Sequence, residues 1–157
     1  MTTKRGAKTA MGRPSDDTTD RAQGFVKVAL QIPDQTLGHV LCSALEGGSG
    51  YWCQIVGHRK PKTLAFRTHG EQVFPHIDYP MNAGGAVYLR ELADDESDFT
   101  GPRHCLTRAA LRRGLALMTD PKKAPIRHLA AILSENFDAE TGDVLLQLSL
   151  LGEIKYG

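Results

Sequence analysis

The chain has 157 residues, of which 41% are hydrophobic and 24% are charged, and its formal net charge is +1. This length supports one domain with a sizeable core and is too short for two. A net charge near zero excludes a strongly basic or strongly acidic protein, although it does not report local patches. The three cysteines do not make a disulfide framework and indicate reduced thiols.

The first 23 residues are rich in Thr and charged side chains and contain Gly and Ser. They lack the apolar surface that ordering requires, so we expect a disordered tail over residues 1–23 and a single α+β domain over residues 24–157. The tail has no apolar core of signal-peptide length, and no apolar run approaches the roughly 18 residues that cross a bilayer. We therefore expect a cytoplasmic protein that has no membrane partner.

The domain is predicted to begin with a strand and a helix. Residues 25–32 nearly alternate between apolar and polar side chains up to Pro33, which predicts a strand. Asp34 stands at a helix N-cap position, and apolar residues follow it at helical spacing as far as Leu45. We expect Gly47 and Gly48 to end this helix in the left-handed conformation.

The middle of the chain predicts a small, mainly antiparallel sheet. Residues 51–56 and 63–68 have the composition of strands and flank a polar turn at residues 57–62, and residues 85–92 predict a further strand. Residues 73–79 are interrupted by prolines and receive no assignment. Residues 94–98 are predicted to form an acidic loop.

The last third of the sequence predicts three helices. Thr107 caps the first, which carries Leu111, Leu115 and Met118 on one face. Pro125 occupies the first turn of the second, whose apolar stripe is formed by Ile126, Leu129, Ala130 and Leu133. The expected fold is thus an α+β domain in which the sheet packs against about four helices.

The third of these helices is apolar around most of its circumference. Asp138 is its expected cap, Gly152 ends it, and two apolar stripes run between them. Such a helix is buried on more than one side, either at the centre of the core or in a homo-oligomer interface. We favour the core, because a small domain needs a central element of this kind.

Three sequence patterns are candidates for a functional site. The Gly47–Gly50 loop leads out of a helix, whereas phosphate-binding loops lead into one, so it is interpreted as a cap and turn. A zinc site could combine His39 and Cys42 with Cys53 and His58, but the spacing differs from the paired cysteines of structural zinc sites. A small metal-dependent hydrolase could be built on four acids, which are Glu46, Glu135, Asp138 and Asp143. No motif has the spacing of a catalytic or cofactor site, and we expect neither a cofactor nor a bound metal.

Basic residues concentrate between residues 103 and 128, where Asp120 is the single acid. Such a patch attracts nucleic acid or an acidic protein surface. It contains no aromatic residue for base stacking, which counts against a reader of single strands. The predicted partner-binding residues are Arg108, Arg112, Arg113, Lys122, Lys123 and Arg127. Tyr51 or Trp52 is predicted to add an aromatic anchor, because neighbouring strand residues face opposite ways and one of the two should be exposed.

The sequence from residue 32 to the C-terminus resembles an uncharacterised family of small phage- and prophage-encoded accessory proteins. The segments that carry the resemblance are residues 41–48, Tyr51–Trp52, residues 111–118, residues 135–144, Gln147, Gly152–Glu153 and Tyr156–Gly157. The resemblance implies an origin in a mobile element and a bacterial host, and it transfers no catalytic residues.

From these patterns we expect a non-enzymatic accessory protein that binds a host macromolecule, for example to inhibit a bacterial defence system such as a CRISPR effector. A host or phage protein is the expected partner. Nucleic acid bound at the basic helical patch is one alternative, and the small hydrolase is another.

Overall fold

The computed structural model describes residues 29–93 and 99–157. Residues Gln31–Gly157 form one compact unit, which contains all the helices and strands of the described residues. In chain order these are α1 (Asp34–Ser43), the π-helical segment η1 (Ala44–Gly48), β1 (Cys53–Arg59), α2 (Pro75–Met81), β2 (Ala86–Glu91), β3 (Arg103–Leu106), α3 (Arg108–Met118), α4 (Ile126–Leu133) and α5 (Ala139–Leu150). The expected α+β class is therefore confirmed.

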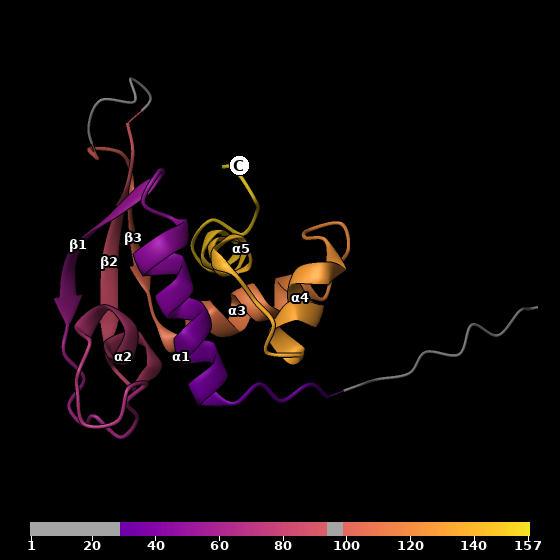
Figure 1. Cartoon of the computed structure of the whole chain (residues 1–157). Coiled ribbons are helices and arrows are strands. Elements are labelled where there is room, and N and C mark those ends of the chain that lie inside the picture. The colour runs from indigo at the N-terminus through magenta and orange to yellow at the C-terminus, as the bar shows by residue number, and fades with distance from the viewer. Residues whose placement is uncertain (1–28, 94–98) are drawn as a thin grey trace, which may run out of the picture. The chain divides into compact units, whose positions relative to one another are not determined.

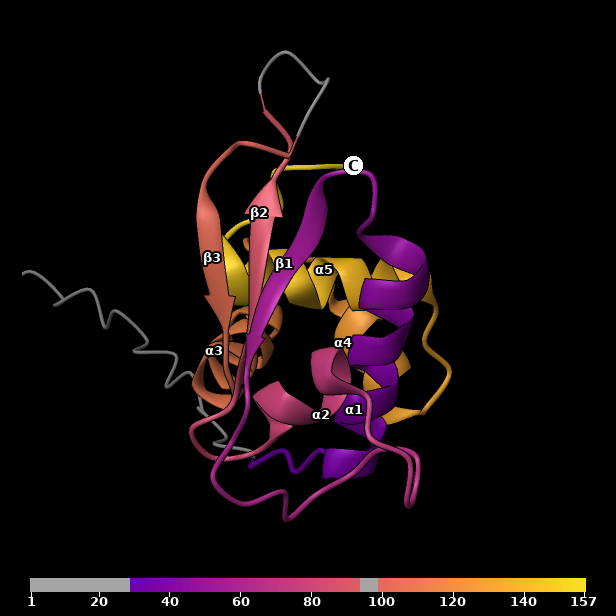
Figure 2. The ribbon, with the colours of Figure 1, turned by 90° about the vertical axis from the view of Figure 1, so that its left-hand side faces the viewer.

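The three strands form an antiparallel sheet in the order β1-β2-β3. One face of this sheet packs against the helices, and Figures 1 and 2 show α5 and α3 on that side. Val87 and Leu89 of β2 point toward the helices together with Leu106 of β3, and all three belong to the hydrophobic core. A bulge at Val56 shifts the register of β1 against β2 between Ile55 and Gly57. The bulge adds one residue to β1, and the alternation of side chains between the two faces resumes after it.

Helix α5 lies at the centre of the core, where it packs against α1, η1, α3 and α4. Every residue from Thr141 to Ser149 is buried, which confirms the core interpretation of its two apolar stripes. Asp138 caps the helix by accepting a hydrogen bond from Thr141 N at 2.8 Å, and Gly152 follows its end with φ 78°. Thr107 caps α3 in the same way by accepting from Ala110 N. These caps are where the sequence placed them.

The start and end of the first helix differ from the prediction. Pro33 is the N-cap, and Asp34 is the first helical residue, without a side-chain cap bond. The helix continues through η1 to Gly48, and neither Gly47 nor Gly48 adopts a positive φ. Gly48 is required for a different reason, since a Cβ there would lie 2.4 Å from the carbonyl oxygen of Ala139. The glycine permits close approach of η1 to α5 rather than a left-handed cap.

The predicted strand over residues 63–68 is wrong. The main chain of this segment is hydrogen-bonded to side chains of α2 and its C-cap: Asn82 bonds both the N–H and the carbonyl of Phe66, and Asp78 accepts from Thr68 N. Because these groups are satisfied, the segment needs no neighbouring strand. Residues 73–79, which had no assignment, contribute to α2, in which Pro75 stands at the helix start.

Three further differences concern strands. β1 runs on to Arg59, through part of the predicted turn at residues 57–62. β3 was not predicted at all, because four residues carry too short a pattern. Of the predicted strand over residues 25–32, residues 25–28 lie outside the described residues, and residues 29–32 are not in a strand. The predicted tail over residues 1–23 and the acidic loop at 94–98 also fall outside the description.

Candidate functional site

The carboxylate of Asp143 is buried at the junction of α5 and the turn that follows η1. It accepts four hydrogen bonds, which come from Ser49 Oγ at 2.6 Å, Tyr51 Oη at 2.8 Å, Trp52 Nε1 at 2.6 Å and Gln147 Nε2 at 2.8 Å. Asp143 lies five residues after Asp138, the N-cap of α5, on the helix face that meets this turn. The sequence segments around Tyr51 and Asp143 therefore meet at one charged group.

Gln147 extends this network to the C-terminal residues. One turn after Asp143, its Nε2 also donates to the carbonyl of Tyr156 at 2.9 Å, and its Oε1 accepts from the main-chain N–H groups of Lys155 and Tyr156, each at 2.8 Å. The chain end is thereby held against α5, and the ring of Tyr156 stacks on that of Trp52 with 5.1 Å between centroids.

A second buried carboxylate, Glu91 of β2, lies beside this network. Tyr156 Oη donates to its Oε2, Lys155 Nζ lies 2.9 Å from the same oxygen, and His104 Nε2 lies 2.5 Å from Oε1. Burial raises the pKa of Glu91, but the hydrogen bonds from Tyr156, Lys155 and His104 outweigh it and lower the pKa to about 2. Glu91 is thus a satisfied anion rather than a proton donor.

Asp143, Gln147, Trp52 and Glu91 of this network are buried. Trp52 is 1% exposed, so it does not serve as the exposed anchor that the sequence allowed. Tyr51 is 52% exposed, so one of the two residues is exposed and the other buried, as predicted. Both lie in the turn before β1 and direct their polar atoms to Asp143. Burial together with the bond to Asp143 raises the pKa of Tyr51 to about 12. The network therefore joins distant parts of the chain, and it reaches solvent at Tyr51 and at Lys155.

The predicted zinc ligands do not converge. Cys42 donates to Glu46 at 3.3 Å, and Glu46 also bonds His76 Nε2 at 3.0 Å, on the exposed side of α1 and η1. Cys53 is buried and donates to the carbonyl of Ser49, whereas His58 contacts the edge of Tyr79. Burial and Glu46 raise the pKa of Cys42 to about 11, and burial raises that of Cys53 to about 12. Both thiols are therefore held protonated, unlike nucleophilic or metal-binding cysteines.

The four acids of the hydrolase alternative are each engaged separately. Glu135 accepts from Thr36 Oγ1, Asp138 caps α5, and Asp143 is the centre of the buried network. In residues 29–93 and 99–157, no group of three or more His, Cys, Asp or Glu side chains could hold a metal ion. A shared metal centre for these acids is thus not formed by the described residues.

The predicted basic residues divide into two groups. Arg108 is half-buried and pairs with both carboxylate oxygens of Asp34, at 2.6 and 2.8 Å, while donating to the carbonyl of Met81. It joins α3 to α1 and α2. Arg127 is exposed and pairs with Glu140 at 2.9 Å. The other four, Arg112, Arg113, Lys122 and Lys123, are exposed and form no side-chain ion pair with any described residue.

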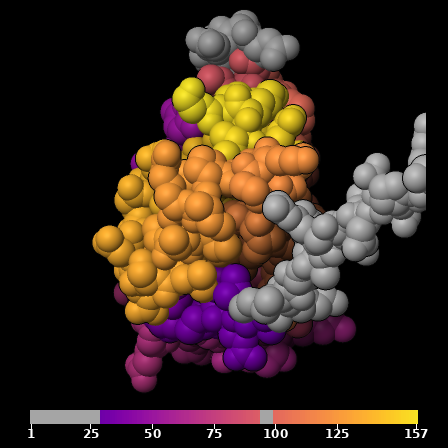
Figure 3. Space-filling model, turned by 90° about the vertical axis from the view of Figure 1, so that its right-hand side faces the viewer, coloured from indigo at the N-terminus to yellow at the C-terminus, as the bar shows by residue number. Residues whose placement is uncertain are grey.

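Helix α4 departs from its predicted orientation. Of the four residues in the predicted stripe, only Leu129 is buried, beside His128 and Ile132. Ile126 is 57% exposed, Leu133 is 46% exposed, and Ala130 is also exposed. These three residues, at spacing i, i+4 and i+7, form an apolar stripe that faces solvent. We call it the α4 stripe; Figure 3 shows the face of the molecule at which α3 and α4 reach the surface.

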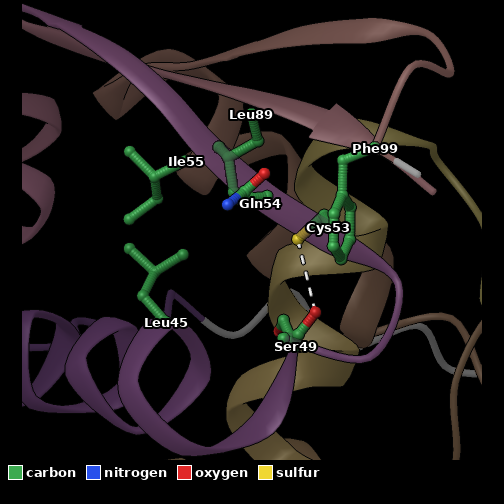
Figure 4. A pocket seen from close by; sticks show the side chains of 8 residues that line it. Leu45, Ser49, Cys53, Gln54, Ile55, Leu89 and Phe99 are labelled. Carbon is green, nitrogen blue, oxygen red and sulfur yellow. Dashed lines mark hydrogen bonds between the residues drawn. The ribbon is translucent and has the colours of Figure 1, made fainter. Parts of the chain in front are cut away.

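A small pocket of about 300 Å³ lies between η1 and the start of β1. Figure 4 shows Leu45, Ile55 and Leu89 on one side of it and the Cys53 thiol directed at the carbonyl of Ser49. Its charged or titratable lining among the described residues is limited to Cys53. The raised pKa keeps that thiol protonated at neutral pH, so Cys53 is not a ready nucleophile.

Comparisons with protein-family profiles, with curated protein sequences and with solved structures find no match to this chain. None of the helices in the described part of the chain has the length and apolar composition to cross a membrane.

Proposed function

We propose that this protein is a non-enzymatic binding protein that docks onto a host protein through the α4 stripe and the cations around it. The observation that carries the proposal is the exposure of Ile126 and Leu133 on one side of a short helix. An apolar stripe left in solvent is costly for a soluble domain and is typical of a surface that a partner covers.

The charges around the stripe define the chemistry of the partner. Lys122 and Lys123 lie in the turn just before α4, and Arg127 follows Ile126. An apolar centre with a polar rim is the usual anatomy of a protein interface, and cations at the rim select an acidic partner surface. Exposed aliphatic side chains contribute little to the binding of a phosphate backbone, which is mainly electrostatic. A protein is therefore the favoured partner at this surface.

Two observations favour binding over catalysis. The pKa values of the Cys42 and Cys53 thiols are raised to about 11 and about 12, so both thiols are protonated at neutral pH. The carboxylates with the most hydrogen bonds, Asp143 and Glu91, are satisfied by fixed donors and hold parts of the fold together. A protein that acts by covering a surface needs only the complementary surface, and we infer a phage or prophage accessory protein acting in the bacterial cytoplasm. Inhibition of a defence enzyme, such as a CRISPR effector, is the concrete form of this proposal.

The proposal is tested by affinity capture from nuclease-treated bacterial lysate with the wild-type chain and with Ile126→Asp. A captured protein with an acidic surface should be lost with Ile126→Asp and weakened by the double change Lys122→Glu and Lys123→Glu. Val56→Asp is the matched control, because Val56 is also an exposed aliphatic residue, at 44%, but lies on the sheet. Capture that is unchanged by Ile126→Asp, or lost equally with Val56→Asp, would contradict the proposal. Capture that is seen only in untreated lysate and is lost with Arg112→Gln plus Arg113→Gln would favour nucleic acid at the basic helical patch.

A further inference from the structure

The face of the sheet that points away from the helices carries a set of residues that the function proposed above does not use. Strand pairing places Arg90 opposite Arg103 and Gln54, and Tyr88 opposite Cys105 and Gly57. Directly opposed residues of an antiparallel pair share a face, and the next residues along β2, Val87 and Leu89, point into the core. We call this surface the open sheet face; Figure 2 looks onto it, with α3 and α5 behind the strands.

The open sheet face is cationic. Arg59 pairs with Ala86 in the same alternation, so Arg59, Arg90 and Arg103 all belong to this face. None of the residues that strand pairing places on it is acidic. Arg103 and Cys105 are exposed, and Arg90 and Tyr88 are partly exposed. Three guanidinium groups without a carboxylate among the paired strand residues of this face attract an anionic polymer.

Tyr88 and Arg103 form a platform at the middle of this face. The guanidinium of Arg103 lies 4.3 Å from the centroid of the Tyr88 ring. Gly57 on the neighbouring strand leaves room for the ring, since a Cβ at that position would lie 3.8 Å from Tyr88 Cδ2. Aromatic rings and the planes of arginine side chains are the groups on which proteins stack unpaired bases.

At the end of β1 the face continues into a cavity of about 500 Å³. Its basic lining residues are Arg59, Lys60 and Lys62, and none of the described residues that line it is acidic. Arg59 Nε donates to the carbonyl of Gly84 at 2.9 Å, which orients the guanidinium and leaves its two terminal nitrogens without a partner among the described residues. A fork held in this way can bind two oxygens of one phosphate, and the exposed ammonium groups of Lys60 and Lys62 add charge beside it.

We propose that the open sheet face and this cavity together bind single-stranded nucleic acid. Phosphates bind at Arg59, Lys60 and Lys62, and a base stacks on the Arg103–Tyr88 platform. Arg59 pairs with Ala86 and Gln54 pairs with Arg90, so the two positions lie four residues apart along β2. At the usual rise of a strand this is about 13 Å, a span that a few extended nucleotides cover. A single strand is favoured over a duplex because the platform can stack only a base that is free of its partner.

The test measures the fluorescence anisotropy of a labelled oligothymidine of about 12 nucleotides with the full-length chain at low ionic strength. Two double variants should each weaken binding about tenfold: Arg90→Gln with Arg103→Gln, and Lys60→Gln with Lys62→Gln. The second pair is exposed and forms no contact that the fold needs, so it keeps the test valid if the first pair is unstable. Each phosphate contact that is removed should also reduce the slope of log affinity against log salt by about 0.7.

Arg112→Gln with Arg113→Gln is the matched control, because it removes the same charge from α3, outside the open sheet face. It should bind within about twofold of the wild type. The proposal is overturned if the wild type does not bind, or if the control loses as much affinity as the sheet variants. Equal affinity for a duplex of the same length would overturn the assignment to single strands. These variants leave Ile126 and the α4 stripe intact, so failure here is distinguishable from failure of the protein-binding proposal.

Discussion

The ring of Tyr156, the penultimate residue, stacks on the ring of Trp52 at an interplanar angle of 11°. Its hydroxyl continues past the stack to Glu91 on β2. One side chain at the chain end thus closes contacts with the turn before β1 and with the sheet. The conformation of the C-terminal residues is therefore part of the fold, and changes at Tyr156 should be felt by the whole domain.

Replacing Tyr156 separates these two contacts. Tyr156→Phe keeps the stack but removes a donor from buried Glu91, and should lower the free energy of unfolding by about 1 kcal/mol. Tyr156→Ala also removes the ring and should cost about 3 kcal/mol. Urea unfolding followed by the fluorescence of Trp52, the only tryptophan, measures both. Equal losses for the two variants would show that the stack contributes nothing.

Asp143→Asn tests the buried carboxylate. The charge that four donors share is lost, and the amide nitrogen of Asn faces hydrogen-bond donors instead of acceptors, so we expect a loss of about 3 kcal/mol in the free energy of unfolding. Glu140→Gln is the matched control on the same helix, because its carboxylate is 64% exposed and pairs with an exposed arginine. It should change stability by less than about 0.5 kcal/mol. A variant Asp143→Asn as stable as this control would refute the structural role of the network.

Glu91 predicts how stability responds to acid. Its pKa is about 2 in the folded protein against 4.5 in the unfolded chain. Because the folded value is the lower one, the stabilisation is complete above about pH 4.5 and is lost as the pH falls toward 2. The difference in unfolding free energy between the wild type and Glu91→Gln should therefore shrink over this range, by on the order of 2 kcal/mol. A difference that stays constant from about pH 5 to about pH 2 would contradict the low pKa of Glu91 in the folded protein.

Gly142→Ala should destabilise the protein although alanine favours helices by about 1 kcal/mol over glycine. A Cβ at Gly142 would lie 2.7 Å from the main-chain nitrogen of Ala44 and 2.8 Å from the carbonyl oxygen of Val40, so α1 and η1 would have to move away from α5. We expect a net loss of about 2 kcal/mol in thermal or urea unfolding. Gly47→Ala is the control, because its Cβ would meet Ala139 at an ordinary 3.7 Å. Stabilisation by Gly142→Ala would show that the helices do not cross this closely.

The helices and caps that depend on local sequence could be predicted. Thr107 and Asp138 satisfy N–H groups three residues ahead of them, so a short pattern is sufficient to place α3 and α5. The segment over residues 63–68 was wrongly predicted as a strand, because its main chain is satisfied by the side chains of Asn82 and Asp78 rather than by a neighbouring strand. Glycine is unfavourable inside a helix, and the close approach of Gly142 to Ala44 across the helix contact explains why α5 carries one there.

The candidate site was less predictable, because exposure depends on what the rest of the chain covers. The spacing of Ile126, Leu129 and Leu133 predicts an apolar helix face. It does not predict that, of these three residues, only Leu129 is buried in the core. In the same way, Arg108 was grouped with Arg112 by charge, whereas its partner Asp34 is 74 residues away in sequence. The open sheet face required the register of β3, a strand that the sequence did not reveal.

The most direct test of the central claim is site-specific photo-crosslinking in nuclease-treated bacterial lysate, with a photoreactive residue placed at Ile126, at Leu133 or at Val56. The proposed docking surface predicts one protein adduct of the same mass from positions 126 and 133, and none from position 56. Crosslinks to that protein from position 56 alone, or no adduct from either position on α4, would contradict the proposal that the α4 stripe is where this protein meets its partner.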